Sequence, residues 1–320
     1  MEPISEIDPS TNQLYFRGFN AVELARTTDF ESVLFLLVNG NLPTSRQRMD
    51  LIQRMKSFRG FYTHDIKSIG NLIDRLGNFR THSNLDLHDT LLAFVTLCPI
   101  IIANQLVHPK INQQNRELNH AANFLRLAKG TALSKQDVID FQTALILPMD
   151  DPDNPSLSAL IQSLDDGDFT NALHAALREH LGPLHHGAGT LAMEMLTEIQ
   201  KPENAHEYLE NRLNSGEKIF GLGHRIYRGI DPRAVILREM LERRVLSTSQ
   251  EWLMHVSDAV AKEGRMLLLQ KKAIDAFPNI DLYNAAVYST FGFHPELNTS
   301  LFAISRAAGW MAHILELEGE

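Results

Sequence analysis

The chain has 320 residues, of which 44% are hydrophobic and 22% are charged, and its formal net charge is -9. This length supports one large domain or two smaller ones, and the composition is that of an ordinary globular protein. The acidic balance argues against non-specific nucleic-acid binding, which requires a basic face. Cys98 is the single cysteine, so no internal disulfide can form. We therefore expect a cytoplasmic protein that does not bind nucleic acid.

Two features bear on membranes. The first residues, Met-Glu-Pro-Ile-Ser-Glu, lack the basic flank and the apolar centre of a signal peptide. The longest apolar run, from Leu91 to Ala103, is too short to span a bilayer and contains Pro99. We expect a buried helical region that is broken near the proline, and no membrane partner.

Helical spacing of apolar residues is common along the chain, whereas strand-like alternation is scarce. Residues 13–16 are the best strand candidate and suggest a small N-terminal β-hairpin. Residues 30–38 have helical spacing and end at Asn39-Gly40, a typical helix stop. Further helices are expected at 171–181, 234–245 and 301–315. The pattern predicts an all-α fold.

The densest group of functional side chains follows a glycine turn. The segment reads Gly221-Leu-Gly-His224-Arg-Ile-Tyr-Arg228-Gly-Ile-Asp-Pro-Arg233. Glycines allow a sharp turn and the close approach of a ligand, and arginine forks suit carboxylate or phosphate groups. A cationic cluster in an acidic protein indicates an anionic substrate.

Three other residues are candidates for chemistry. His185 follows Gly182-Pro-Leu, Asp281 follows Phe277-Pro-Asn-Ile, and Arg306 lies within an apolar helix. Each also has a structural interpretation: a loop histidine, a helix N-cap, and an arginine whose stem covers apolar surface. Taken singly, these residues do not distinguish the two interpretations.

Four histidines lie close together in the sequence, as they would in a metal site. No pair among His174, His180, His185 and His186 has the three- or four-residue spacing that aligns two ligands on one helix face. We expect no metal.

Taken together, the motifs resemble the citrate synthase family. The matching segments occur in the family's order over almost the whole chain: Leu14-Tyr-Phe-Arg-Gly-Phe19, Gly40-Asn-Leu-Pro-Thr44, Gly182-Pro-Leu-His185, Gly221-Leu-Gly-His-Arg-Ile-Tyr227, Asp231-Pro-Arg233, Asn279-Ile-Asp281-Leu-Tyr283 and Phe302-Ala-Ile-Ser-Arg306-Ala-Ala-Gly-Trp310.

The resemblance implies roles for these residues. Asp281 is the base that removes a proton from an acyl-CoA, and His185 hydrogen-bonds the thioester oxygen. His224 polarises and then protonates the ketone of a 2-oxo acid such as oxaloacetate. The binding residues implied are Arg233, Arg306 and Asn154 for the 2-oxo acid and Arg228 for the CoA phosphates.

The resemblance also implies a helical fold with two domains that close on the substrate. The large domain would comprise 1–185 and 291–320, and the small domain 186–290, which carries His224 and Asp281. A homodimer is the expected assembly. No cofactor is expected, because the CoA thioester is itself a substrate.

The chain departs from the family at several positions. The best match to the family's Asp-His-Glu-x-x-Asn segment begins at Asp150, so Asp151 replaces a histidine that binds the 2-oxo acid. A carboxylate there repels a dicarboxylate unless it is protonated or turned away. His186 and Gly189 replace the family's glycine and asparagine. The resemblance further implies a C-terminal tail that lends an arginine to the partner, whereas this sequence ends at Glu320.

Three hypotheses follow. The first is an acyltransferase that condenses acetyl-CoA, or a longer acyl-CoA, with a 2-oxo acid and hydrolyses the thioester. The second is a non-catalytic paralogue that binds a metabolite or partner, a possibility raised by Asp151 and by the short C-terminus. The third is the same site run backwards as a citryl-CoA lyase.

Overall fold

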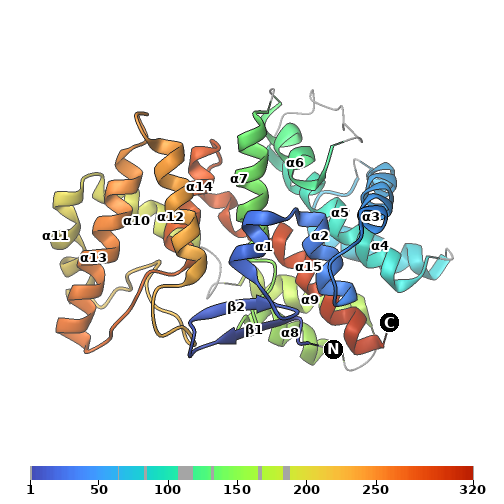
Figure 1. Cartoon of the computed structure of the whole chain (residues 1–320), viewed down its shortest axis with the longest axis horizontal. Coiled ribbons are helices and arrows are strands. Elements are labelled where there is room, and N and C mark those ends of the chain that lie inside the picture. The colour runs from blue at the N-terminus through green and yellow to red at the C-terminus, as the bar shows by residue number, and fades with distance from the viewer. Residues whose placement is uncertain are drawn as a thin grey trace. The chain divides into compact units, whose positions relative to one another are not determined.

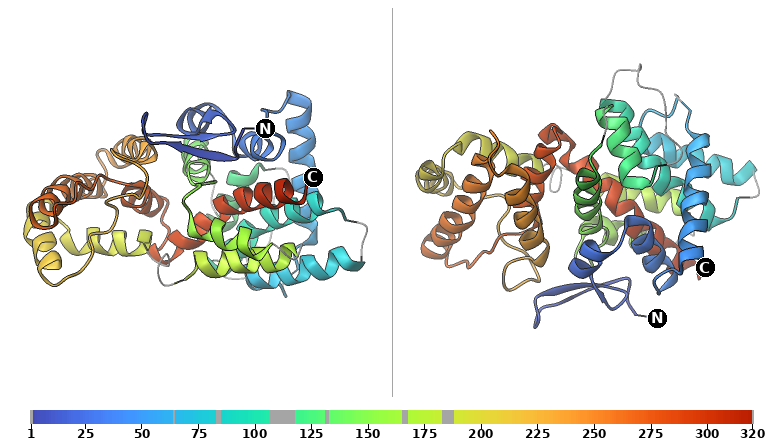
Figure 2. Two further views of the ribbon diagram at one scale, coloured as in Figure 1. Left: turned by 90° about the horizontal axis from the view of Figure 1, so that it is seen from below. Right: turned by 45° about the horizontal axis from the view of Figure 1, so that its top comes forward.

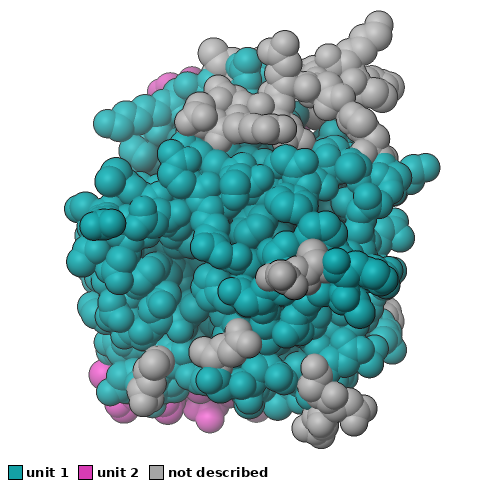
Figure 3. Space-filling model, turned by 90° about the vertical axis from the view of Figure 1, so that its right-hand side faces the viewer, with its two compact units in different colours: residues 1–6, 15–181, 300–320 teal, residues 7–14, 182–299 magenta. Residues whose placement is uncertain are grey.

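Helices make up most of the chain in this computed structural model, which confirms the all-α prediction (Figure 1). The structure describes residues 2–63, 65–82, 85–106, 118–130, 133–164, 168–182 and 188–319. Within these ranges the chain divides into two compact units. The first comprises Met1–Glu6, Tyr15–Leu181 and Ser300–Glu320, and the second comprises Ile7–Leu14 and Gly182–Thr299. Figure 3 shows one face of the first unit in teal. The boundaries at 185/186 and 290/291, which were predicted for two domains that close on a substrate, stay a prediction.

A small sheet lies at the N-terminus. Its strands, in the order β1-β2-β3, are β1 (Ser5–Asp8), β2 (Gln13–Phe16) and β3 (Phe19–Asn20). The predicted strand at 13–16 is therefore confirmed, with a third strand beside the expected hairpin. In the turn between β1 and β2, the Asp8 carboxylate accepts hydrogen bonds from the Ser10 hydroxyl, the Thr11 hydroxyl and the Ser10 N–H. These bonds lower the pKa of Asp8 to about 2.

The first unit is a helical assembly around one central helix. Helix α15 (Asn298–Glu318) is drawn in red in Figure 2. It has buried residues around its whole circumference, among them Leu301, Ile304, Ala308 and Trp310. The predicted helix at 30–38 is α2 (Phe30–Asn39), capped by Asp29 and ended by left-handed Gly40. The unit's other helices are α1 (Ala21–Thr27), α3 (Ser45–Phe58), α4 (Ile69–His82), α5 (Leu87–Leu106), α6 (His120–Lys129), α7 (Lys135–Ile146), α8 (Pro155–Ser163) and α9 (Phe169–His180).

The apolar run around Pro99 forms one continuous helix, so the expected break is wrong. Helix α5 runs from Leu87 to Leu106 with Pro99 inside it. Nearly every residue from Leu87 to Ala103 is buried, and this packing outweighs the hydrogen bond that proline cannot donate. By length and composition α5 is apolar enough to cross a membrane, but 83% of its most apolar window is buried within the protein. A helix in a protein core can be equally long and apolar, so this composition is weak evidence for a membrane span.

The second unit is built around α14 (Ile280–Thr290), whose buried residues also cover its circumference. Helix α14 packs against α10 (Ala188–Ile199), α12 (Pro232–Val245) and α13 (Trp252–Lys272), and α11 (Ala205–Asn214) packs against α13. The loop before α12 carries the predicted catalytic histidine, and the first turn of α14 carries the predicted catalytic aspartate. The central helix of this unit therefore begins at the candidate site.

A buried polar cluster lies in the first unit, apart from the predicted site residues. The Glu31 carboxylate accepts the backbone N–H of His120 at 2.8 Å, at the start of α6, and the His120 ring stacks on Phe30 at 4.2 Å. Burial raises the pKa of Glu31. Burial, aided by the charge of Arg59, lowers the pKa of His120 to about 3. The folded protein therefore holds a neutral histidine here at any pH well above 3.

This histidine predicts acid lability. In the unfolded chain His120 binds a proton below its ordinary pKa of 6.5. In the folded chain it does not bind this proton until about pH 3. Stability contributed by neutral His120 is present above pH 6.5 and falls by up to about 1.4 kcal/mol per pH unit below it. Glu31 acts in the opposite direction, because a raised carboxyl pKa favours the folded state as pH falls. In His120→Phe, which keeps the ring stack, we expect urea denaturation to show a smaller stability loss between pH 7 and 4.5. An unchanged loss would contradict this assignment.

Candidate active site

The glycine turn before His224 is shaped by its contact with α14. Gly221 and Gly223 have left-handed φ angles of +79° and +88°, which favour glycine. A Cβ at Gly221 would lie 2.6 Å from Cβ of Leu282, so a side chain there would force the turn off the helix. The turn also pairs with the segment before α14, through Gly223 N–H to Phe277 O at 2.7 Å and Asn279 N–H to Gly221 O at 3.0 Å.

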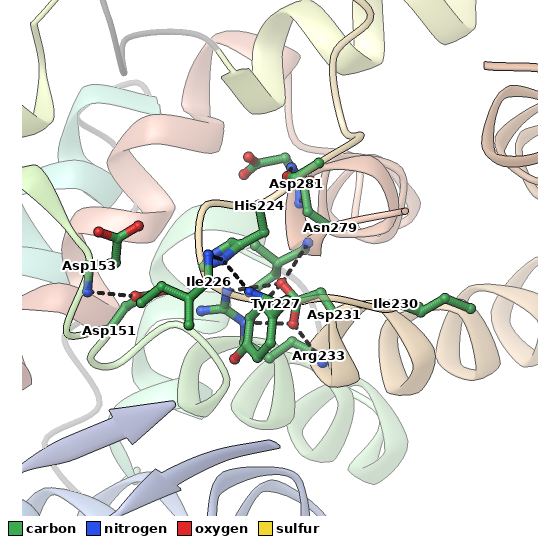
Figure 4. A network of polar contacts seen from close by, with 12 residues as sticks. Asp151, Asp153, His224, Ile226, Tyr227, Ile230, Asp231, Arg233, Asn279 and Asp281 are labelled. Atoms are coloured by element: carbon green, nitrogen blue, oxygen red, sulfur yellow. Dashed lines mark hydrogen bonds and ion pairs between the residues drawn. The ribbon is translucent and has the colours of Figure 1, made fainter. Parts of the chain in front are cut away.

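Asn279 joins the loop that carries His224 to the first turn of α14, which carries Asp281. Its carboxamide oxygen accepts the backbone N–H of Asp281 at 3.0 Å and caps α14, while its NH2 group donates to the carbonyl of Gly223 at 2.9 Å (Figure 4). The N-cap is therefore Asn279, and Asp281 lies in the first turn of the helix. This removes the interpretation of Asp281 as a plain N-cap. A carboxylate in the first turn is favoured by the positive end of the helix dipole.

The ring of His224 is held in one tautomer. Its Nδ1 accepts backbone N–H groups from Ile226 at 3.2 Å and Tyr227 at 3.4 Å. An accepting Nδ1 leaves the proton on Nε2, which is then a hydrogen-bond donor. The ring also lies 4.4 Å from the ring of Tyr227. The local turn thus prepares His224 to donate to an oxygen.

Arg233 lies in the first turn of α12 and is almost completely buried. Its Nε and Nη2 donate to the Asp231 carboxylate at 2.9–3.2 Å, and both side chains are 1% exposed. Asp231 also accepts the backbone N–H of Ile280 at 3.2 Å. The Arg233 guanidinium lies 5.6 Å from the Tyr227 ring centre. Asp231 therefore connects the predicted carboxylate clamp to the start of the helix that carries Asp281.

Arg306 belongs to the first unit, where it is buried on α15. The nearby Asp150 carboxylate accepts the Ser5 hydroxyl at 2.6 Å and bonds His313 Nε2 at 2.8 Å. Burial raises the pKa of Asp150, but His313, Ser5 and the charge of Arg306 together outweigh burial and lower it. Gly309 allows this approach, since a Cβ there would lie 2.5 Å from the Met149 carbonyl oxygen.

Asp151 and Asn154 lie beside this group, at the start of α8. The Asp151 side chain is buried, and its carboxylate accepts the N–H of Asp153 at 3.1 Å. The oxygen of Asn154 caps α8 by accepting the N–H of Ser156 at 2.8 Å and its hydroxyl at 2.6 Å. The structure thus gives Asn154 a capping function, and its contact with substrate stays a prediction.

The remaining predicted residues differ in how they are placed. His185 and His186 lie within 183–187, outside the described residues. Arg228 lies in the second unit and is exposed. His224, Asp281 and Arg233 come together in that unit through Asn279 and Asp231, whereas Arg306, Asp151 and Asn154 belong to the first unit.

One group in the described ranges has the spacing of a metal site. Ligand atoms of Asp86, His88 and Asp89 lie within 4.8 Å of one another. The Asp89 carboxylate already forms a two-fold ion pair with Arg54. The positive charge of Arg54 opposes a cation at this position, so the group is better explained as a surface ion pair.

Comparison with known proteins shows the family of the chain. The family model described as "Citrate synthase, C-terminal domain" matches residues 2–320. The chain belongs to the citrate synthase family. It is 30% identical to a citrate synthase of Acidithiobacillus ferridurans over 97% of this chain and 87% of that protein. It is 29% identical to a 2-methylcitrate synthase of Shewanella oneidensis over 98% and 87%.

Solved structures agree on the citrate synthase fold. The citrate synthase of Thermotoga maritima matches with a TM-score of 0.84 at 27% identity, over 99% of this chain and 88% of that one. The Thermoplasma acidophilum enzyme, solved as a ternary complex with carboxymethyl coenzyme A and oxaloacetate, matches with a TM-score of 0.87 at 23% identity, over 100% and 90%. Family membership supports a citrate synthase-type transferase.

Sequence reasoning missed three residues that organise the site: Asn12, Asp231 and Asn279. Asn279 carried a local signal, because asparagine two residues before an acidic first-turn residue is a common helix start. Asp231 had the same signal before Pro232. Asn12 is separated from its partners by more than 200 residues, so no local pattern indicates it.

Proposed function

We propose that this protein condenses an acyl-CoA with a 2-oxo acid and then hydrolyses the resulting thioester to release CoA. The observation that carries this proposal is the Asn279 bridge. It ties His224, whose Nδ1 accepts backbone N–H groups, to the helix turn that presents the Asp281 carboxylate. A base and a hydrogen-bond donor, held by one side chain, suit enolate formation and attack on a ketone.

In the first step, the Asp281 carboxylate takes a proton from the carbon next to the thioester carbonyl. This carbon is a weak acid, so the enolate needs a hydrogen bond to its oxygen, which we assign to His185. The CoA thioester supplies the activation, and no resident cofactor is needed.

In the second step, the enolate carbon bonds to the ketone carbon of the 2-oxo acid. The ketone oxygen gains the electron pair and takes the proton from Nε2 of His224. Water then adds to the thioester carbonyl, one of its protons leaves with the CoA thiol, and the other goes to solvent as the new carboxyl group ionises. The proton held by Asp281 returns to Nε2 of His224, which restores both side chains. Proton removal and carbon–carbon bond formation use only the two substrates and the side chains, and water enters as a reactant in the hydrolysis.

We assign binding of the 2-oxo acid to Arg233, Arg306 and Asn154 and binding of the CoA phosphates to Arg228. Guanidinium forks suit carboxylates because two N–H groups meet two oxygens. The Asp231–Arg233 pair supports this assignment, since Asp231 fixes the plane of the fork. We further infer a cytoplasmic homodimer, as the single cysteine and the family resemblance predict.

The identity of the 2-oxo acid depends on Asp151. By resemblance this buried carboxylate stands where the family has a histidine, and a carboxylate there disfavours a second substrate carboxylate beside it. We propose that the protein prefers a 2-oxo acid other than oxaloacetate, and that Asp151→His raises turnover with oxaloacetate.

Release of CoA thiol tests the proposal. Acetyl-CoA and propionyl-CoA are each offered with oxaloacetate and with 2-oxo acids that lack the second carboxylate. We expect release that requires both substrates, with Asp151→His shifting the preference towards oxaloacetate. A folded sample that binds CoA but releases thiol with no combination would refute the proposed reaction.

A further inference from the structure

The tip of the N-terminal hairpin holds the loop that carries Arg228. Asn12 lies in the turn between β1 and β2, within residues 7–14 of the second unit. Its carboxamide oxygen accepts the N–H of Arg228 at 3.1 Å and the N–H of Gly229 at 3.1 Å. Its NH2 group donates to the carbonyl of Ile230 at 2.6 Å. One side chain thus satisfies three consecutive residues of the loop.

The backbone conformation of Asn12 and the small size of Gly229 both favour this contact. Asn12 has a left-handed φ of 56°, a conformation that asparagine tolerates better than most residues other than glycine. The Asn12 carboxamide lies against Gly229, where an added Cβ would come within 3.5–3.7 Å of its atoms. Two successive N–H groups that point at one oxygen form a small acceptor-binding concavity, which the Asn12 oxygen fills. Glycine could adopt the same φ but could make none of the three hydrogen bonds.

The contact fixes the backbone of Arg228, from which its side chain extends. Arg228 is exposed, so its guanidinium is available to a ligand in solution, and its long side chain has many rotamers. A loop that also fluctuated would add to the entropy lost when the guanidinium binds a phosphate. Asn12 removes that part of the cost by fixing the backbone before the ligand arrives.

We propose that Asn12 is a positioning residue for CoA recognition, which acts by holding the 228–230 loop so that Arg228 meets the CoA phosphates. This inference rests on the proposed function, in which Arg228 contacts those phosphates. It adds a residue from the opposite end of the sequence to the CoA-binding half of the site. It also gives the N-terminal hairpin a part in substrate binding.

The test is calorimetric titration with CoA itself, using the full-length chain. In Asn12→Gly, which keeps the backbone conformation, we expect CoA to bind about three- to tenfold more weakly, as the loss of partly exposed hydrogen bonds implies. Asn12→Asp keeps the oxygen that meets both N–H groups but loses the donor to the Ile230 carbonyl, so it is expected to bind CoA no more tightly than the wild type and to restore at most part of the affinity. Asn214→Gly is the matched control, because it removes one exposed asparagine hydrogen bond, to Lys271, elsewhere in the same unit.

A double-mutant cycle separates positioning from general loosening of the hairpin. If Asn12 acts through Arg228, Asn12→Gly weakens CoA binding by less than about twofold in an Arg228→Ala background. The KM for the 2-oxo acid should stay unchanged in Asn12→Gly while the KM for the acyl-CoA rises. Thermal melting of each variant checks that the fold is retained.

The outcomes distinguish this inference from the proposed function. If the wild-type chain turns over acyl-CoA and Asn12→Gly binds CoA equally well, the inference is wrong and the proposed function stands. Full additivity with Arg228→Ala, or an equal loss in Asn214→Gly, would also overturn it. A wild-type chain that binds no CoA overturns both.

Discussion

Asp281→Asn is expected to lower the rate of CoA release by about a hundred- to ten-thousandfold, the usual contribution of a general base. The change removes the proton acceptor but keeps the shape of the side chain. The Asn279 cap remains, because it bonds the backbone N–H of residue 281 and not its side chain. CoA affinity and melting temperature should therefore change little. Steady-state thiol release, with CoA titration alongside, provides the measurement.

Proton exchange isolates the step assigned to Asp281. In D2O the wild-type protein should exchange the acyl protons of acetyl-CoA for deuterium, as followed by NMR, and Asp281→Asn should not. Asp275→Asn is the matched control. Asp275 is an exposed aspartate in the segment before α14, and it forms an ion pair with Arg265. If the wild type binds CoA but exchanges no protons, and Asp281→Asn behaves in the same way, the non-catalytic paralogue becomes the better description. Retained activity in the variant would instead place the base elsewhere.

Asp231→Ala is expected to lower the free energy of unfolding by about 3–5 kcal/mol, the usual cost of leaving one charge of a buried pair without its partner. Arg233 would remain almost fully buried, and the link from the loop to the N–H of Ile280 would be lost. Since that link lies one residue before Asp281, we expect turnover to fall as well. Urea denaturation and thiol release measure the two effects.

Two variants test the origin of this loss. Asp231→Ala combined with Arg233→Leu removes both charges and should recover part of the stability, because no buried charge is left alone. Asp275→Ala breaks an exposed ion pair in the same unit and should have little effect, since solvent screens it. Equal destabilisation by Asp231→Ala and Asp275→Ala would contradict the role given to burial.

Much of the fold and the chemistry of the site could be predicted from the sequence. Local patterns sufficed where a helix has one apolar face and clear ends, as in α2 between Asp29 and Gly40. They also sufficed for the glycine turn, because left-handed angles such as those at Gly221 and Gly223 favour glycine, and Gly221 has no room for a Cβ beside Leu282. They failed at Pro99, where burial on all sides keeps α5 continuous against the preference of the proline.

The sequence by itself determined the helical class, the family resemblance and the set of side chains able to perform acid–base chemistry. The tertiary structure decided how several of those side chains are held. The tautomer of His224 follows from two backbone N–H groups, the plane of Arg233 from Asp231, and the Arg228 loop from Asn12. The Asn12 contact joins residues more than 200 positions apart. Residue type and local spacing report what a side chain can do, whereas the folded backbone determines which hydrogen bonds hold it, within one turn at His224 and Arg233 and between distant segments at Asn12.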